Sequence, residues 1–293
     1  MPLVRLHCTP AVEPNACVVH TMGGLLPAAP TLTFDDTIGA AKMPVRFRER
    51  LETEDLHAEL WPTVAGSEPP PGTAALVLGH QQDARGAMPC PATASVAQPP
   101  APRLAAVALA MDPVRQCVLL TRRPRSMRTF PGAWVLPGGS VDATDGSTAA
   151  AALRELAEET GLAASEAVGA VPFCLWESCY PPSFELWREK QEGGGRCSHF
   201  VICYHKVAVD SRQPLELQPE ECDCAVWVPL HHLAGPLAGR DAGAEAASDS
   251  YERAAGSPAG EPVPASLLTG VYPNALGEGV GRAHLFAISQ LGQ

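Results

Sequence analysis

Three glutamates within five consecutive residues are the side chains of this sequence best suited to chemistry: Glu155, Glu158 and Glu159. They belong to a run of helix-favouring residues that begins near Thr148 and ends at Gly161. At about 100° per residue along a helix, the three carboxylates cluster on one face. The opposite face carries an amphipathic set that would pack on a core: Ala149, Leu153, Leu156, Ala157 and Thr160. We therefore expect the acidic face to point outwards, into solvent or a cleft.

Carboxylates this close to one another repel unless a cation lies between them. Because all the candidate ligands are oxygen atoms, a hard divalent ion such as Mg²⁺ or Mn²⁺ is the expected partner. Gly138 and Gly139 allow a sharp turn before the helix, through which the main-chain carbonyl of Gly139 could approach the same ion. A metal held in this way suits attack by water on a diphosphate, since the cation neutralises charge on the phosphoryl oxygens. The alternative is an ordinary Glu-rich helix whose charged face is simply solvated.

The stretch from Pro137 to Leu162 resembles the Nudix box, whose pattern is Gly-x5-Glu-x7-Arg-Glu-apolar-x-Glu-Glu-x-Gly-apolar. One position departs from the pattern, because Asp145 replaces the first Glu and eight residues, not seven, separate it from Arg154. The resemblance implies an α/β fold, the α/β/α sandwich of Nudix hydrolases with a mixed β-sheet between helices. It also implies a metal-dependent pyrophosphohydrolase that cleaves a nucleoside diphosphate linked to another moiety. The helical glutamates would then bind the metal, directly or through water, and one of them would act as base.

Two more residues are candidates for the catalytic site. Arg154 stands four residues before Glu158 on the helix, so we expect it to orient the carboxylates rather than to touch substrate. Glu221 lies six residues before Trp227, at the point where many Nudix enzymes carry a further metal-binding or basic Glu in a loop. The alternative for Glu221 is a solvated loop acid beside Glu220.

Substrate contacts are expected from arginines and one tryptophan. Four arginines occur within seven residues just before the Gly-Gly turn: Arg122, Arg123, Arg125 and Arg128. Arginine forks suit phosphate oxygens, so an anionic substrate could bind to Arg123 and Arg128; the alternative is simple solubility of an exposed strand end. Trp176 could stack on a base, although a tryptophan in a strand is more often part of a core.

Two Nudix subfamilies share further residues with this chain. The span LLTRRPRSMRTFPGAWVLPGG resembles the coenzyme A diphosphatases, through Thr121, Arg123, Arg128 and Gly132. Leu175–Ser178, Tyr180–Pro182 and Phe286–Ala287 support a broader resemblance, from about Arg103 to Leu291 with gaps. It is to the nucleoside diphosphate-linked moiety X motif 17 group, which is associated with methylated mRNA caps. It implies a capped RNA or cap-like dinucleotide as substrate, with coenzyme A, acyl-CoA or NAD(H) as the alternative. A catalytically inactive Nudix module that only binds nucleotides, or an interaction scaffold built on the Pro-rich flanks, are alternatives of other classes.

The distribution of proline and glycine along the chain predicts the domain boundaries. These residues cluster in Pro69–Pro71, in Cys90–Pro102 and in the Ala/Gly/Ser-rich stretch Gly235–Pro264, which are typical of linkers. We expect an accessory or largely flexible region over residues 1–102, a Nudix core over 103–234, a low-complexity insertion over 235–264 and a C-terminal segment over 265–293. The Pro/Gly/Ala-rich flanks are expected to be poorly ordered.

Hydrophobic periodicity predicts the elements around the acidic helix. Leu104–Met111 and Gln116–Arg123 flank an Asp-Pro turn and are typical of a β-hairpin. Further strands are predicted at Phe173–Ser178, His199–Val209 and Ala225–Val228, and a last helix at Arg282–Leu291. Leu51–Trp61 is predicted to be a short helix.

The net charge, the hydropathy and the cysteine content of the chain limit which partners and which cellular location are expected. The net charge of −11 argues against a surface that coats nucleic acid, so no DNA partner is expected. No apolar run approaches the roughly 20 residues that span a bilayer, and no membrane partner is expected. Ten cysteines occur without a Cys-x-x-Cys pair, which favours reduced, mostly buried thiols and an intracellular, cytoplasmic location.

Overall fold

A computed structural model describes thirteen segments of the chain. They are residues 4–8, 33–35, 40–63, 71–81, 102–164, 169–181, 184–195, 197–237, 250–251, 253–256, 262–268, 270–273 and 277–292. The chain divides into two compact units. The first comprises Met1–Ala106, Ser140–Ala151 and Pro172–Tyr204, and the second comprises Val107–Gly139, Ala152–Val171 and His205–Gln293.

The first unit is a mixed β-sheet. Its strands follow the order β1 (Val4–Cys8), β4 (Asp55–Pro62), β3 (Ala40–Glu52), β5 (Ala74–Gln81), β10 (Val171–Tyr180) and β11 (Ser198–Ala208). The short β2 (Thr33–Asp35) pairs with β3, and α3 (Phe184–Glu192) follows β10. The β1–β4 and β5–β10 pairs are parallel, whereas β3 is antiparallel to both β4 and β5.

The predicted short helix over Leu51–Trp61 is wrong, because this segment forms the end of β3, a turn and most of β4. Leu56, Ala58 and Leu60 alternate with more exposed residues and are fully buried. This is the two-residue period of a strand. Pairing with β3 buries that apolar face, which a short isolated helix could not do.

A buried acid and two histidines lie inside the first unit. The Glu177 carboxylate on β10 is 0% exposed, and its Oε1 is 2.8 Å from Nε2 of His199. Nδ1 of His80 is 3.1 Å from the main-chain oxygen of Glu177. Nothing in the sequence singled out these residues, because they come from three separate strands. Their mutual contacts join β5, β10 and β11 inside the sheet.

The second unit holds an antiparallel sheet around the predicted hairpin. Its strands follow the order β6 (Arg103–Asp112), β7 (Cys117–Arg122), β12 (Cys224–Pro229) and β14 (Arg253–Gly256). The short β8 (Trp134–Val135) pairs with β7, and β9 (Gly138–Ser140) pairs with β6. A separate two-stranded sheet joins β13 (Ser250–Tyr251) to β15 (Val263–Pro264). The strands predicted at 104–111, 116–123, 173–178, 199–209 and 225–228 are all confirmed.

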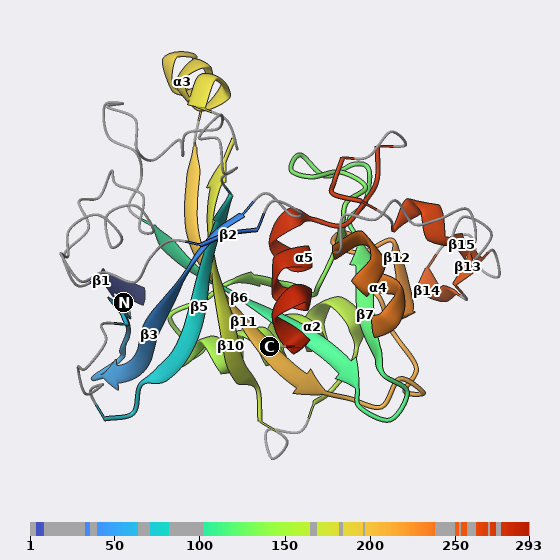
Figure 1. The fold of residues 1–293 in the computed structure, drawn as a ribbon, viewed down its shortest axis with the longest axis horizontal. Coiled ribbons are helices and arrows are strands. Elements are labelled where there is room, and N and C mark those ends of the chain that lie inside the picture. The colour runs from blue at the N-terminus through green and yellow to red at the C-terminus, as the bar shows by residue number, and fades with distance from the viewer. Residues whose placement is uncertain are drawn as a thin grey trace. The chain divides into compact units, whose positions relative to one another are not determined.

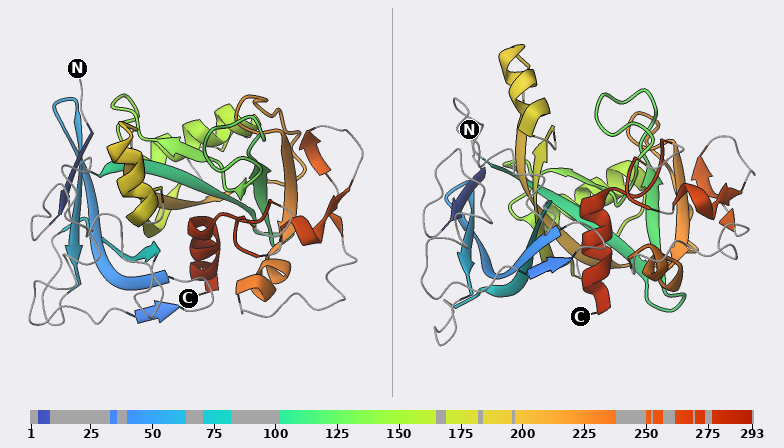
Figure 2. Two further views of the ribbon diagram at one scale, coloured as in Figure 1. Left: turned by 90° about the horizontal axis from the view of Figure 1, so that it is seen from above. Right: turned by 45° about the horizontal axis from the view of Figure 1, so that its top comes forward.

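Helices lie on both faces of this antiparallel sheet. They are α2 (Thr148–Thr160), α4 (Leu230–Leu237), α5 (Arg282–Ser289) and the 3₁₀ turns η3 (Ala265–Leu267) and η4 (Gln290–Gly292). Figure 2 shows α2 and α5 on opposite faces of β6 and β7, and α4 lies next to α5 on the same face (Figure 1). The predicted α/β fold with a mixed β-sheet is confirmed, since the chain combines these helices with both parallel and antiparallel strand pairs. Among the described helices, none combines the length and apolarity that a bilayer crossing requires.

The structure describes the side chains of seven cysteines. All seven are free thiols, and six of them are buried: Cys117, Cys174, Cys179, Cys203, Cys222 and Cys224. Cys197 is partly exposed. Their burial agrees with the prediction of thiols that pack as small apolar groups.

The β6–β7 turn is held by the buried carboxylate of Asp112. Its Oδ1 accepts hydrogen bonds of 2.9 Å from the main-chain N–H groups of both Val114 and Arg115. Its Oδ2 accepts from the main-chain N–H and the hydroxyl of Ser211, at 3.0 and 2.7 Å. The Ser211 hydroxyl and the main-chain donors hold the pKa of Asp112 far below its usual range.

Replacement of Asp112 by Asn is expected to lower the free energy of unfolding by about 2 kcal/mol at pH 7, because charge-assisted hydrogen bonds are lost. The folded-state pKa is depressed, so this stabilisation is present above the ordinary value of 3.8 and is lost as the pH falls below it. The gap between wild type and variant should therefore shrink on acidification. Urea unfolding from pH 7 to pH 3 measures it, with the same substitution at the exposed Asp142 (Asp142→Asn) as control. A gap independent of pH would contradict the assignment.

Candidate metal centre

Helix α2 carries the three glutamates, and its boundaries agree with the prediction. The Ser147 hydroxyl accepts a hydrogen bond of 3.0 Å from the Ala150 N–H, which satisfies one of the free donors at the helix start. At the other end, Gly161 has a φ of +72° and donates to the Ala157 carbonyl at 2.9 Å. Glycine ends the helix here because an L side chain is strained in this left-handed conformation.

The expected outward orientation of the whole acidic face is wrong. Glu155 and Glu159 are buried, at 9% and 5% exposure, whereas the Glu158 side chain is 54% exposed. The reason is geometric: residues four apart on a helix lie about 40° from each other, whereas neighbouring residues lie about 100° apart. Glu155 and Glu159 therefore share one face, while Glu158 and Ala157 face solvent.

A loop far along the chain adds a third carboxylate to the buried pair. One carboxylate oxygen from each of Glu155, Glu159 and Glu221 lies within 4.8 Å of the other two. Within the described ranges, this is the single group of three or more acidic, histidine or cysteine side chains with ligand atoms so close. Glu221, unlike the helical pair, is not buried. The structure thus brings together three of the residues that the sequence nominated.

Main-chain hydrogen bonds at the end of α2 place the Glu221 loop. The N–H of Glu216 donates to the Thr160 carbonyl at 2.9 Å, and the N–H of Gln218 donates to the Glu159 carbonyl at 3.1 Å. The Gln218 carbonyl in turn accepts from the N–H of Glu221 at 3.0 Å. These bonds satisfy carbonyls that a helix end leaves free, and they place the Glu221 turn beside Glu159.

The Gly-Gly turn lies directly against the acidic pair. The N–H of Gly138 donates to Oε1 of Glu159 at 3.2 Å. A Cβ atom on Gly139 would lie 2.5 Å from Oε1 and 2.8 Å from Oε2 of Glu155. Only a hydrogen atom fits at that position, so the close approach of this backbone to the Glu155 carboxylate requires glycine.

The electrostatics of the cluster favour a bound cation. Burial, helped by the charges of Glu155 and Glu221, raises the pKa of Glu159 to about 8 against the opposing hydrogen bonds from Gly138 and Cys222. Burial also raises the pKa of Glu155, which Arg154 partly offsets. Buried carboxylates in this arrangement are stabilised when a positive charge is placed among them. Since every donor atom is oxygen, the set fits Mg²⁺ or Mn²⁺.

Arg154 bridges two of the glutamates in the way the sequence suggested. Its Nη1 donates to Oε1 of Glu155 and to Oε2 of Glu158, both at 2.9 Å. Glu158 therefore lies beside the cluster, on its solvent side, and outside the group of three close carboxylates. The arginine holds the Glu155 side chain in place through an ion pair that is only partly exposed.

Two of the four arginines before the Gly-Gly turn form ion pairs within the protein. Nε of Arg122 lies 2.7 Å from Oδ1 of Asp223, and Nη2 of Arg125 lies 2.7 Å from Oε1 of Glu278. Glu278 is 3% exposed and also accepts from Nε1 of Trp134 at 3.0 Å. Glu278 was not among the predicted site residues, and its only signal in the sequence is its place between two glycines in the C-terminal segment.

The predicted substrate contacts differ in their exposure. Arg128 is exposed, whereas Arg123 donates from Nε and Nη2 to the carbonyl and hydroxyl of Thr129, at 3.2 and 3.3 Å. Trp176 is 3% exposed within β10, so its burial favours the alternative of a core residue over a stacking platform.

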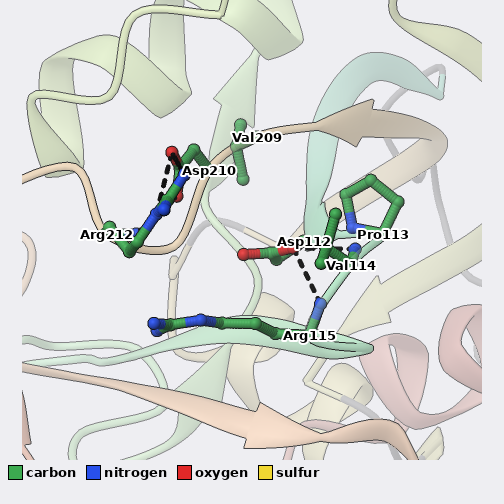
Figure 3. A pocket seen from close by; sticks show the side chains of 7 residues that line it. All are labelled: Asp112, Pro113, Val114, Arg115, Val209, Asp210 and Arg212. Carbon is green, nitrogen blue, oxygen red and sulfur yellow. Dashed lines mark hydrogen bonds and ion pairs between the residues drawn. The ribbon is translucent and has the colours of Figure 1, made fainter.

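A pocket of about 250 Å³ lies at the β6–β7 turn (Figure 3). Asp112, Val114, Arg115 and Arg212 are among its lining residues. The Asp112 carboxylate already accepts four hydrogen bonds, and Asp210 forms an ion pair of 2.7 Å with Arg212. The two acids that line this pocket thus have hydrogen-bond or ion-pair partners within the protein.

The family follows from comparison with known proteins. The profile of the NUDIX domain matches residues 101–249, which is half of the chain and includes the Gly-Gly turn, α2 and Glu221. The chain belongs to the NUDIX family. The predicted resemblance to the Nudix box is therefore confirmed, and the acidic cluster lies inside the matched part of this NUDIX protein.

Curated relatives match part of the chain. The m7GpppN-mRNA hydrolase NUDT17 of Danio rerio is 37% identical over 129 residues, which are 42% of this chain and 40% of the relative. NUDT17 of Homo sapiens is 33% identical over 140 residues, 46% of this chain and 40% of the relative. An uncharacterized Nudix hydrolase, NudL of Enterobacter sp. (strain 638), is 47% identical over 57 residues, 19% of this chain and 30% of the relative. The matches thus span less than half the length of these relatives.

Solved structures of Nudix proteins are also similar. One is the NUDIX domain of Shewanella oneidensis NrtR in complex with ADP ribose, at 23% identity, 46% coverage of this chain, 77% of that chain and a TM-score of 0.35. Another is a MutT NUDIX hydrolase from Burkholderia pseudomallei, at 23% identity, 44% and 84% coverage and a TM-score of 0.33.

Proposed function

We propose that this NUDIX protein is a pyrophosphohydrolase that cleaves a nucleoside diphosphate linked to another moiety and depends on Mg²⁺ or Mn²⁺. The observation that carries the proposal is the convergence of Glu155, Glu159 and Glu221 against the Gly-Gly turn. A surface helix would gain nothing from this arrangement, since burial of carboxylates close to one another is destabilising without a cation between them. A catalytic metal site requires such a group of carboxylates, because they bind the cation.

Each residue of the site has a role in this proposal. Glu155, Glu159 and Glu221 hold the cation, with the main-chain carbonyl of Gly139 as a further ligand and Glu158 acting through water. When bound, the ion supplies Lewis acidity that offsets charge on the phosphoryl oxygens. Arg154 keeps the Glu155 carboxylate aimed at the cluster. Glu221 is the member of the three that is not buried, so it is the carboxylate placed to take a proton from the attacking water.

A capped RNA or a cap-like dinucleotide is the substrate that we propose first. Support comes from the NUDT17 relatives, whose name describes hydrolysis of m7GpppN-mRNA. Arg123 and Arg128 would bind the phosphates of such a substrate, and Arg128 is exposed for this purpose. Coenzyme A, acyl-CoA and NAD(H) are the competing substrates, because the segment around Thr121 also resembles coenzyme A diphosphatases.

A nucleotide-binding NUDIX module without catalysis is the candidate of a different class. Such a module would have no need for three carboxylates that meet within 4.8 Å, of which two are buried. The same observation argues against a scaffold whose function lies in the Pro-rich flanks. The full acidic set therefore favours hydrolysis.

Product analysis of the full chain tests the proposal. Cap analogue, coenzyme A and NADH are incubated side by side with Mg²⁺, Mn²⁺ or EDTA, and the products are identified by mass spectrometry. We expect metal-dependent cleavage at the pyrophosphate bond, fastest for the cap analogue. Glu221→Gln should lower the rate, whereas its exposed neighbour variant Glu220→Gln should not.

Nucleotide binding without turnover in any metal would instead support the binding module. Faster cleavage of coenzyme A or NADH would retain the hydrolase and replace the proposed substrate.

A further inference from the structure

Both oxygens of the buried Glu159 carboxylate have a donor supplied by the protein. Oε1 accepts from the main-chain N–H of Gly138 at 3.2 Å, and Oε2 accepts from the Cys222 thiol at 3.3 Å. The thiol is as deeply buried as its partner, since Cys222 is 2% exposed and Glu159 is 5% exposed. The two donors lie on different oxygens, so together they restrict rotation of the carboxylate plane.

The position of the thiol is itself determined by its surroundings. The Cys222 N–H donates to the Gln218 carbonyl at 2.8 Å, and the Gln218 N–H donates to the Glu159 carbonyl at 3.1 Å. The hydroxyl of Thr121, which is 0% exposed in β7, lies near the thiol. Main-chain hydrogen bonds to the end of α2 thus fix the backbone position of Cys222 beside Glu159.

We propose that Cys222 is a positioning residue of the metal centre, whose thiol orients the Glu159 carboxylate for the cation. The proposal rests on the proposed function in one respect, namely that Glu159 is a ligand. Two consecutive residues of the turn before β12 then serve the metal centre. Glu221 supplies a carboxylate, and Cys222 supplies a hydrogen-bond donor to the Glu159 carboxylate. A thiol suits this position because it is a small apolar group that still carries a weak donor.

Hydrogen-bond partners of metal ligands influence affinity as well as rate. Removal of such a partner typically weakens metal binding or activity by about 10- to 100-fold. An S–H donor is weak, so the lower end of this range is expected. A purely structural role of Cys222 would instead lower stability and leave the affinity of folded protein for the ion unchanged.

The test is calorimetric titration of Mn²⁺ into the full chain, with thermal unfolding of the metal-free protein recorded in parallel. Cys222→Ala removes the donor and should weaken Mn²⁺ binding by about tenfold. Cys222→Ser keeps a hydroxyl donor and should restore the affinity to within about threefold of wild type. The matched control is Cys117→Ala, which removes a buried sulfur from the start of β7, beside Ser211 rather than Glu159. It should leave the affinity unchanged.

Three outcomes would overturn the inference. They are equal Mn²⁺ affinity in Cys222→Ala and wild type, equal weakening in the Ala and Ser variants with both folded, and absence of Mn²⁺ binding by wild type. Failure of the proposed function has a different signature, which is Mn²⁺ binding by wild type without cleavage of any substrate. In that case the titration would still test whether the Mn²⁺ affinity depends on Cys222.

Discussion

Glu159→Gln is expected to lower kcat by about 100- to 1,000-fold with the fold retained, the size of effect seen when one group that stabilises charge in a transition state is removed. The substitution keeps the shape of the side chain and removes the negative charge that the cation requires. Because burial already disfavours that charge, the neutral amide should leave the metal-free protein at least as stable as wild type. Steady-state kinetics and thermal unfolding without metal measure the two effects.

Two matched substitutions separate the metal site from general loss of charge. Glu220→Gln changes the net charge by the same amount on an exposed loop residue, and it should leave kcat unchanged. Glu158→Gln should have a smaller effect than Glu159→Gln, because the Glu158 side chain is 54% exposed and lies outside the group of three close carboxylates. Equal rates in Glu159→Gln and wild type would remove Glu159 from the site.

Gly139→Ala is expected to lower kcat by about 100-fold with little loss of stability. The new Cβ would lie 2.5–2.8 Å from the Glu155 carboxylate oxygens, so the carboxylate must move. A flexible side-chain end can move at low cost to the fold, yet a displacement of about 1 Å at a reacting centre can reduce the rate by about 100-fold. Steady-state kinetics and urea unfolding of the same preparation separate these two consequences.

A double-mutant cycle with Glu155→Gln identifies the carboxylate as the target. If Gly139→Ala acts by displacing Glu155, its effect on kcat should be much smaller in the Glu155→Gln background, because the two changes affect one group. Fully additive effects would show that the methyl group acts on something other than Glu155.

Local sequence patterns predicted the elements of the NUDIX core correctly. The acidic helix was expected from near Thr148 to Gly161 and runs over Thr148–Thr160. The hairpin was expected at 104–111 and 116–123 and occupies Arg103–Asp112 and Cys117–Arg122. These features depend on hydrophobic period, on turn residues and on a glycine that ends a helix, and all of these act over a few residues.

The errors arose where a local pattern was compatible with two environments. The Leu51–Trp61 segment contains helix-favouring residues, but its apolar residues alternate with polar ones. It forms a strand because pairing with β3 buries these apolar residues. The acidic face of α2 was expected to point outwards, into solvent or a cleft, because the opposite face has the amphipathic pattern that packs on a core. A loop and a glycine turn cover part of it instead, so that Glu155 and Glu159 are buried.

The sequence by itself determined the residues on which the proposed chemistry of this NUDIX protein depends: the acidic helix, the glycines that precede it and the oxygen atoms suited to a hard cation. Only the tertiary structure decided which side chains meet there. Cys222, 63 residues after Glu159, reaches its carboxylate, and Glu221 joins the buried pair while Glu158 stays outside it. Helical spacing and turns depend on neighbouring residues, whereas these meetings depend on main-chain hydrogen bonds between α2 and a distant loop, which no local period encodes.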